Sequence, residues 1–103
     1  MIIYNVTLNV DDSIREEWLE WMRKIHLPEM LQTGLFVEYK FLRLIDDTDE
    51  DTTGSTYAVQ FFMNDVKDFL DYTENHAAAL RKKTMDKYGE KILSFRTLLE
   101  VLE

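Results

Sequence analysis

The chain has 103 residues, of which 46% are hydrophobic and 31% are charged, and its formal net charge is −8. This balance is typical of a soluble globular protein and excludes a disordered chain, and we expect a single domain over residues 1–103. The negative charge argues against nucleic acid as a partner, because such binding depends on Lys and Arg side chains that neutralise phosphates. The absence of cysteine excludes disulfides and thiolate chemistry, and no apolar run is long enough to cross a membrane.

The first ten residues, MIIYNVTLNV, carry apolar side chains at every second position and contain no basic leader. A secretion signal needs a charged start before an apolar core, so we expect the chain to begin at Met1 and to stay in the cytoplasm. The alternation predicts a strand over residues 2–10. One face of this strand carries Ile2, Tyr4, Val6, Leu8 and Val10. The other face carries Ile3, Asn5, Thr7 and Asn9.

A helix is predicted to follow this strand. Ser13 and Glu16 have the spacing of a capping box, in which two side chains bond to each other's backbone N–H groups. Trp18 and Trp21 lie on the apolar stripe of the helix, so we expect them in the core rather than stacked on a ligand. Pro28 removes a backbone donor and clashes one turn back, so the helix must kink or restart near it.

Residues 35–45 are rich in aromatic and branched side chains and predict a second strand. The acidic stretch DDTDEDTTGS follows, and its Asp47, Asp49 and Asp51 occupy the first, third and fifth positions of a calcium loop. Thr52 stands where that loop needs Gly, and Ala58 stands where it needs Glu. We therefore predict a solvated hairpin loop without calcium and no metal site in the chain.

The second half of the chain repeats the pattern of the first. Residues 57–63 alternate and predict a third strand, after which Asn64 is predicted to cap a helix. The helix should end at Gly89, with a break near residues 73–75, because an unbroken helix would be about 36 Å long at 1.5 Å per residue. Residues 93–101 alternate again and predict a fourth strand.

This order of elements is that of the ferredoxin-like α+β fold, βαββαβ, with a four-stranded antiparallel sheet and helices on one face. Two helices can cover one sheet face only, so the other face should be open. We expect this open face to be too apolar for water, so that two copies pack face to face as a dimeric α/β barrel. Its predicted members are Ile3, Asn5, Thr7, Glu38, Lys40, Gln60, Phe62, Arg96 and Leu98.

Three polar residues of this predicted face, Asn5, Gln60 and Arg96, are the ones that packing explains least. If they converge inside a barrel, they predict a site for a small anionic or amide-bearing molecule, because Arg offers a fork of donors and amides offer both donors and acceptors. His26 and His76 are the candidate catalytic residues, since imidazole titrates near neutral pH. The alternative for each histidine is a structural role, bonded to water or to a carbonyl group at a helix end.

The segment WLEWMRKIHLPEMLQTGLF, together with RTLLEV near the C-terminus, resembles a family of short, uncharacterised bacterial proteins of about this length. This resemblance covers nearly the whole chain and implies no activity. More distantly, MNDVKDFLDYTENHAAALRKK after a strand is similar to the dimeric α/β-barrel superfamily, which contains antibiotic-biosynthesis and haem-degrading monooxygenases. His26 followed by Pro28 resembles a His-x-Pro element of that superfamily. The superfamily resemblance implies a fold rather than a function.

The haem-degrading members of that superfamily pair an Asn on the first strand and a His on the second helix with a Trp near the end of the third strand. Asn5 and His76 match this pattern, whereas Phe62 and Met63 stand where the Trp is expected. The resemblance therefore leaves haem as an alternative, and we expect no cofactor.

We expect a homodimeric binding or interaction module with a small-molecule pocket. The alternative is an enzyme of the dimeric α/β-barrel type, a monooxygenase or an isomerase, in which His76 or His26 acts as acid, base or ligand. An RNA-binding module of the same topology is excluded, because TYAVQF at residues 56–61 lacks the basic residues and glycine of its signature.

Overall fold

The computed structural model describes residues 1–45 and 54–103. The first half of the chain forms β1 (Ile2–Val10), α1 (Arg15–Trp21), a π-helical turn (Met22–His26), α2 (Leu27–Gln32) and β2 (Glu38–Arg43). The second half forms β3 (Ser55–Met63), α3 (Val66–Asn75), α4 (Ala77–Tyr88), a 3₁₀ turn (Gly89–Lys91) and β4 (Ile92–Glu100). The acidic segment for which we predicted a calcium-free loop lies largely outside the described residues.

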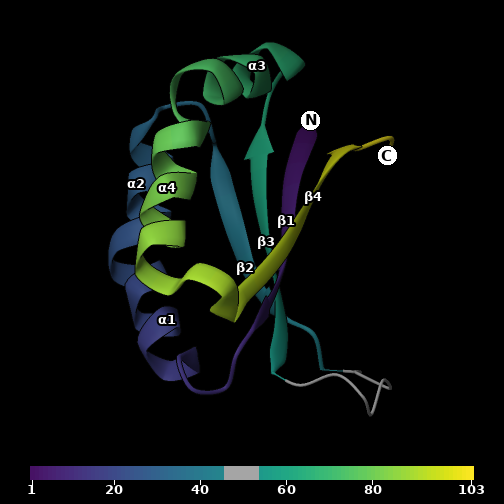
Figure 1. The fold of residues 1–103 in the computed structure, drawn as a ribbon. Coiled ribbons are helices and arrows are strands. Elements are labelled where there is room, and N and C mark those ends of the chain that lie inside the picture. Colours follow the sequence, from purple (N-terminus) through teal and green to yellow (C-terminus); the bar gives the residue numbers. More distant parts are fainter. Residues whose placement is uncertain (46–53) are drawn as a thin grey trace.

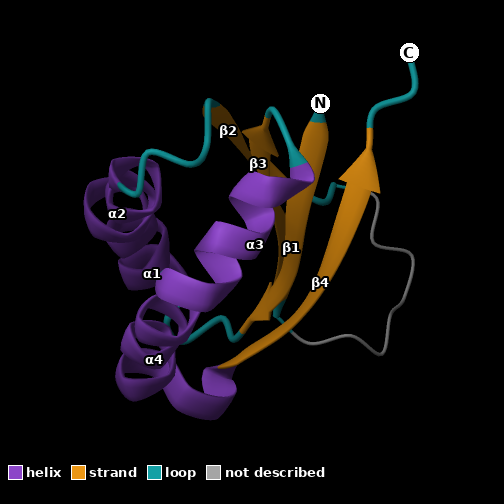
Figure 2. Ribbon diagram, turned by 90° about the horizontal axis from the view of Figure 1, so that it is seen from above, coloured by secondary structure: helices purple, strands orange, loops and turns teal. Residues whose placement is uncertain are grey.

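The four strands form one antiparallel sheet in the order β2-β3-β1-β4. All four helices lie on the same side of this sheet and leave its other side uncovered (Figures 1 and 2). The predicted ferredoxin-like α+β fold is therefore confirmed. Within the described ranges, no helix has the length and apolar character needed to cross a membrane.

The core lies between the sheet and the helices. Both tryptophans belong to it as predicted, since Trp18 is 0% exposed and Trp21 is 9% exposed. The helix-facing side chains of β1 and β3 complete it, and Val10 and Met63 are each 0% exposed. An aromatic cluster of Tyr4, Phe61 and Tyr72 joins the sheet to α3. The helical layer is thereby held to the central strands, while the edge strand β4 is mostly exposed.

The strand register decides which side chains share a face. Asn5 pairs with Gln60 of β3, and Gln60 pairs with Lys40 of β2, so these residues lie on the open face as predicted. Arg96 pairs with Val6, and Leu98 pairs with Tyr4, which are both helix-facing residues. The prediction that Arg96 and Leu98 lie on the open face is therefore wrong. On β4 the open face instead carries Leu93, Phe95, Thr97 and Leu99.

This correction has a physical cause in the position of β4. Both alternating sets of β4 contain leucines, so its hydrophobic pattern alone does not fix the side that faces the core. Ser94 and Arg96 lie on the helix-facing side of this edge strand and are nevertheless exposed. The more apolar set faces away from the helices and is uncovered.

Both helical segments are interrupted, as their sequences predict. In the first, Leu27 N–H donates to the carbonyl of Met22, five residues back, so the π-helical turn absorbs one extra residue just before Pro28. The wider turn accommodates Pro28, which cannot donate a backbone hydrogen bond and whose ring would clash with the preceding turn. In the second, the break lies at His76, one residue beyond the predicted range. Gly89 then ends α4 at a φ of 56°, a conformation that favours glycine.

Two predicted helix caps are wrong. The cap of α3 is Asp65, whose carboxylate accepts a hydrogen bond from Lys67 N–H at 2.9 Å, and Asn64 lies one residue too early. Ser13 does not cap α1, because its own N–H donates to the Asp11 carboxylate at 2.8 Å in a turn that precedes the helix. Capping signals from neighbouring residues compete, and the backbone path at the strand end decides between them.

We predict that Asp65→Ala lowers the free energy of unfolding by about 1 kcal/mol, the usual cost of losing an N-terminal cap. Asn64→Ala is the matched control and should change the stability by less than about 0.5 kcal/mol. Urea unfolding of the two variants measures both values. An equal loss in both variants would contradict the assignment of the cap to Asp65.

Candidate functional site

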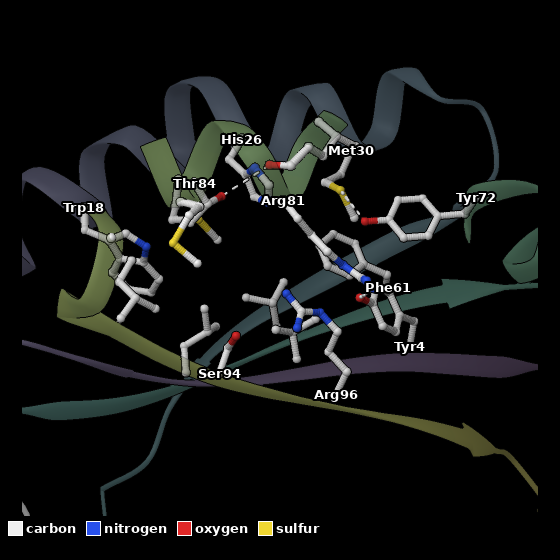
Figure 3. Close-up of a pocket in the computed structure, with 18 residues that line it drawn as sticks. Tyr4, Trp18, His26, Met30, Phe61, Tyr72, Arg81, Thr84, Ser94 and Arg96 are labelled. Atoms are coloured by element: carbon white, nitrogen blue, oxygen red, sulfur yellow. Dashed lines mark hydrogen bonds between the residues drawn. The ribbon is translucent and has the colours of Figure 1, made fainter. Parts of the chain in front are cut away.

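A cavity of about 270 Å³ lies between the helix-facing side of the sheet and the helices, next to β4 (Figure 3). Its interior is mainly apolar. The apolar lining comes from the sheet and the helices: Val6, Leu8, Trp18, Met22, Met30, Val59, Phe61, Leu80, Met85 and Ile92. A smaller set of polar side chains also borders it: Tyr4, His26, Tyr72, Arg81, Thr84, Ser94 and Arg96. An apolar chamber with a few polar groups is the usual form of a small-molecule site.

Two guanidinium groups lie together at one side of the cavity. Arg81 comes from α4 and Arg96 from β4, and in Figure 3 the Arg81 side chain points toward Tyr4 while the Arg96 guanidinium points into the cavity. The Arg81 guanidinium donates to the Tyr4 hydroxyl at 3.2 Å. Both arginines are largely exposed, so they stand at the mouth of the cavity rather than in its depth.

The other basic residues of α4 differ from Arg81 in their partners. Lys82 pairs with Asp86 at 2.6 Å, Lys83 with Glu29 at 2.8 Å, and Lys87 with Glu17 at 3.4 Å.

In the described part of the chain, neither Arg81 nor Arg96 forms an ion pair with a carboxylate. Two adjacent positive charges without a counter-ion create a local potential that favours an anion, even in a protein of net charge −8.

Tyr72 forms the inner wall beside these arginines. Its hydroxyl donates to the sulfur of Met30 at 3.6 Å. Burial and the neighbouring Tyr4 phenol raise the Tyr72 pKa far above its usual value, while the positive charges of Arg81 and Arg96 oppose that rise. Tyr72 therefore stays protonated and neutral and presents a polar but uncharged group.

His26 borders the cavity at the end of the π-helical turn. Its ring stacks on Trp21 with centroids 5.0 Å apart, and its Nδ1 atom is buried without a hydrogen-bond partner among the described residues. Burial lowers the pKa of His26 from 6.5 to about 4, with a smaller opposing effect from Glu29 and a small additional lowering from Lys83. The imidazole is therefore neutral at neutral pH and can accept a proton or a hydrogen bond.

The structure brings together only part of the predicted site. Arg96 and His26 both line the cavity. Asn5 and Gln60 lie on the open face of the sheet, on the side opposite to the cavity, where Asn5 donates to the hydroxyls of Thr7 and Thr97 at 3.1 and 3.3 Å. His76 lies at the junction of α3 and α4 and does not line the cavity.

The placement of Asn5 and His76 also bears on haem. These were the two residues that matched the haem-degrading pattern, and they lie on different sides of the sheet. The described residues thus do not assemble that constellation around the cavity.

Sequence reasoning did not identify Arg81, Tyr4 or Tyr72 as site residues. One signal was present, since Ala77 and Leu80 mark the buried stripe of α4, and Arg81 follows Ala77 by four residues. Residues four apart lie on the same helix face, so Arg81 is placed at the border of the buried stripe. Tyr4 belongs to the apolar face predicted for residues 2–10, whereas Tyr72 was not singled out, and only the packed structure shows that both border a cavity.

Residues 1–102 match the family described as a domain of unknown function, DUF4286. The chain belongs to this family. The match confirms the resemblance to a short, uncharacterised family and assigns no activity to DUF4286 proteins. A search of curated proteins found no match.

Solved structures resemble this DUF4286 domain over nearly its full length. A protein of the ethyl tert-butyl ether D (EthD) family from Bacillus halodurans C-125 is 13% identical, with a TM-score of 0.69, and the match covers 99% of this chain and 100% of that one. A dimeric ferredoxin-like protein from an uncultured marine organism is 10% identical, with a TM-score of 0.62 over 99% and 95% of the two chains. A putative monooxygenase from Shewanella loihica PV-4 is 17% identical, with a TM-score of 0.59 over 99% and 95%. At these identities the likeness establishes the fold alone.

Proposed function

We propose that this DUF4286 protein binds a small organic anion with an apolar body in the cavity between its sheet and its helices. The observation that carries the proposal is the pair of guanidinium groups, Arg81 and Arg96, at the mouth of an otherwise apolar chamber. Guanidinium groups recognise carboxylates through paired hydrogen bonds, and the apolar lining would take up the rest of the molecule.

The size of the cavity limits the ligand. Its volume of about 270 Å³ lies just below the range of sites that hold drug-sized molecules, roughly 300–1,000 Å³. The aromatic rings and methionine side chains of the lining favour a flat or flexible apolar body. A monocyclic aromatic acid matches both the volume and the charge.

Binding of benzoate tests this proposal, with benzamide as its neutral analogue. In isothermal titration calorimetry we expect benzoate to bind with a dissociation constant of about 1 mM or below and benzamide to bind more weakly. Arg81→Ala and Arg96→Ala should each weaken benzoate binding about tenfold, because each removes a charged hydrogen-bond donor.

Three variants serve as controls for this experiment. Arg43→Ala removes an arginine from β2, at the opposite edge of the sheet from β4. Asn5→Ala and Gln60→Ala remove polar groups from the open face. All three should bind benzoate as the wild type does. Equal binding of benzoate and benzamide, or full retention of binding in both cavity variants, would refute the anion site.

We also propose that the protein is a homodimer that forms through its open face. Phe95 on β4 is 62% exposed, and Leu93 and Leu99 beside it are 68% and 44% exposed. Three large apolar side chains exposed on one face of a single strand favour burial against a partner. A structural neighbour described as dimeric has the same fold, which supports the proposal.

An enzyme is the second candidate, and the buried imidazole of His26 favours it. A neutral histidine beside a cavity can accept a proton from a bound molecule and return it to another position, as an isomerase requires. The nearby guanidinium groups could stabilise the negative charge that forms in between. Deuterium uptake from D₂O at carbon by a bound oxo acid such as phenylpyruvate, lost in His26→Gln, would support an enzyme. Uptake no faster than in solution would count against it.

A further inference from the structure

Trp18 presents an unsatisfied hydrogen-bond donor to the cavity. Its side chain is 0% exposed, and its Nε1 atom has no partner among the described residues. The ring is held against Tyr57 and Phe41, with centroid distances of 5.0 and 5.6 Å. In Figure 3 the indole nitrogen points toward the interior of the cavity. An indole N–H can only donate, and buried donors are almost always paired, so the contents of the cavity should supply an acceptor at this point.

The indole N–H and the guanidinium groups lie at different positions along the sheet. Tyr57, which Trp18 contacts, pairs with Leu8 of β1, whereas Arg96 pairs with Val6, two residues further along the strand. Two strand residues span roughly 7 Å along the sheet, and β3 and β4 are also two strand spacings apart across it, roughly 10 Å, because β1 lies between them. A benzene ring that carries one polar group at each end, with a hydrogen bond beyond each group, can bridge such a separation. The cavity lining also includes the apolar side chains of Met22 and Val59.

We infer that the ligand of this cavity is a hydroxylated aromatic acid, with its acidic group at Arg81 and Arg96 and its hydroxyl oxygen accepting a hydrogen bond from Trp18 Nε1–H. This inference rests on the anion site proposed above and adds a second polar group at the opposite end of the molecule. A ring without that group would leave the indole N–H either unpaired or dependent on a trapped water.

The pair 4-hydroxybenzoate and 4-methylbenzoate isolates this contact, because the two probes share the acid and the ring, and the methyl group replaces the hydroxyl at similar size. A purely apolar pocket prefers the methyl group, since a hydroxyl loses its hydration on entering. We expect the reverse, with 4-hydroxybenzoate binding about fivefold more tightly than 4-methylbenzoate in calorimetry. Trp18→Phe keeps an aromatic ring and should abolish or reverse that preference while benzoate itself still binds.

A second measurement on the wild-type protein keeps the test independent of whether Trp18→Phe folds. The chain has two tryptophans, and Trp21 serves as the internal control. In ¹H–¹⁵N spectra, 4-hydroxybenzoate should shift the indole N–H resonance of Trp18 far more than that of Trp21, and 4-methylbenzoate should shift it less. Trp21→Phe assigns the two resonances.

The outcomes separate this inference from the anion site itself. If benzoate binds but the wild type prefers 4-methylbenzoate, or if the Trp18 resonance responds equally to both probes, the hydroxyl contact is refuted and the anion site stands. If none of the three acids binds, both proposals are overturned.

Discussion

Phe95→Glu is expected to convert a dimer of this protein into a monomer of 12.3 kDa. Phe95 is the most exposed aromatic side chain among the described residues of the open face, and it pairs with Thr7 of the neighbouring strand β1. A carboxylate in that position would be buried between two sheets without a partner, which costs about 3–5 kcal/mol. The dissociation constant of the dimer should therefore rise about 100-fold or more.

Sedimentation at micromolar concentration measures this change. Leu70→Glu is the matched control, because Leu70 is 55% exposed but lies on α3, on the opposite side of the molecule. It should sediment as the wild type does, and Phe62→Glu on the open face should weaken the dimer as Phe95→Glu does. A wild-type protein that is monomeric at these concentrations, or a dimer that only Leu70→Glu disrupts, would refute the interface.

The protein is expected to lose stability as the pH falls from 6.5 toward 4, because His26 is held neutral in the folded state. Burial lowers its pKa from 6.5 to about 4. Between these pH values the unfolded chain binds a proton at His26 that the folded chain does not, so the free energy of unfolding rises with pH in this window. Across the whole window the free energy of unfolding changes by about 3 kcal/mol, and between pH 7 and pH 5 it changes by about 2 kcal/mol.

Stacking on Trp21 opposes this effect, since an aromatic face attracts a protonated imidazole. That attraction is worth roughly 0.5–2 kcal/mol when the cation lies over the face of the ring. Burial prevails here, because desolvation is the largest influence on the His26 pKa. The charge of Glu29 favours the protonated imidazole, and the smaller effect of Lys83 opposes it.

Urea unfolding of the wild type and of His26→Gln at pH 7 and pH 5 tests this prediction. The carboxylates titrate in both proteins, so the difference between them isolates His26. The wild type should lose about 2 kcal/mol more than His26→Gln between the two pH values. His76→Gln is the control for the removal of an imidazole outside the cavity. If His76→Gln rather than His26→Gln removes the pH dependence, the assignment to His26 is wrong.

The sequence by itself determined the order and type of the elements, because each depends on neighbours along the chain. The alternation of β1 and β3 is unambiguous, since one alternating set is almost wholly apolar and must face the core. Pro28 lacks an N–H group wherever it lies, so the interruption of the first helix follows directly from the sequence. Gly89 likewise marks the end of α4 through a local backbone conformation. Burial of Trp18 followed from its place on a helical stripe.

Only the tertiary structure decided the face of β4 and, with it, the composition of the candidate site. Both faces of this strand carry leucines, and its orientation is fixed by hydrogen bonds to β1, about ninety residues earlier in the chain. That pairing places Arg96 on the opposite face from Asn5 and Gln60, where it lines the same cavity as Arg81 and His26. A cavity is the space that remains where packed elements fail to meet, so it has no signal in any local stretch of sequence. The three candidate side chains come from three separate elements, and long-range packing alone brings them to one cavity.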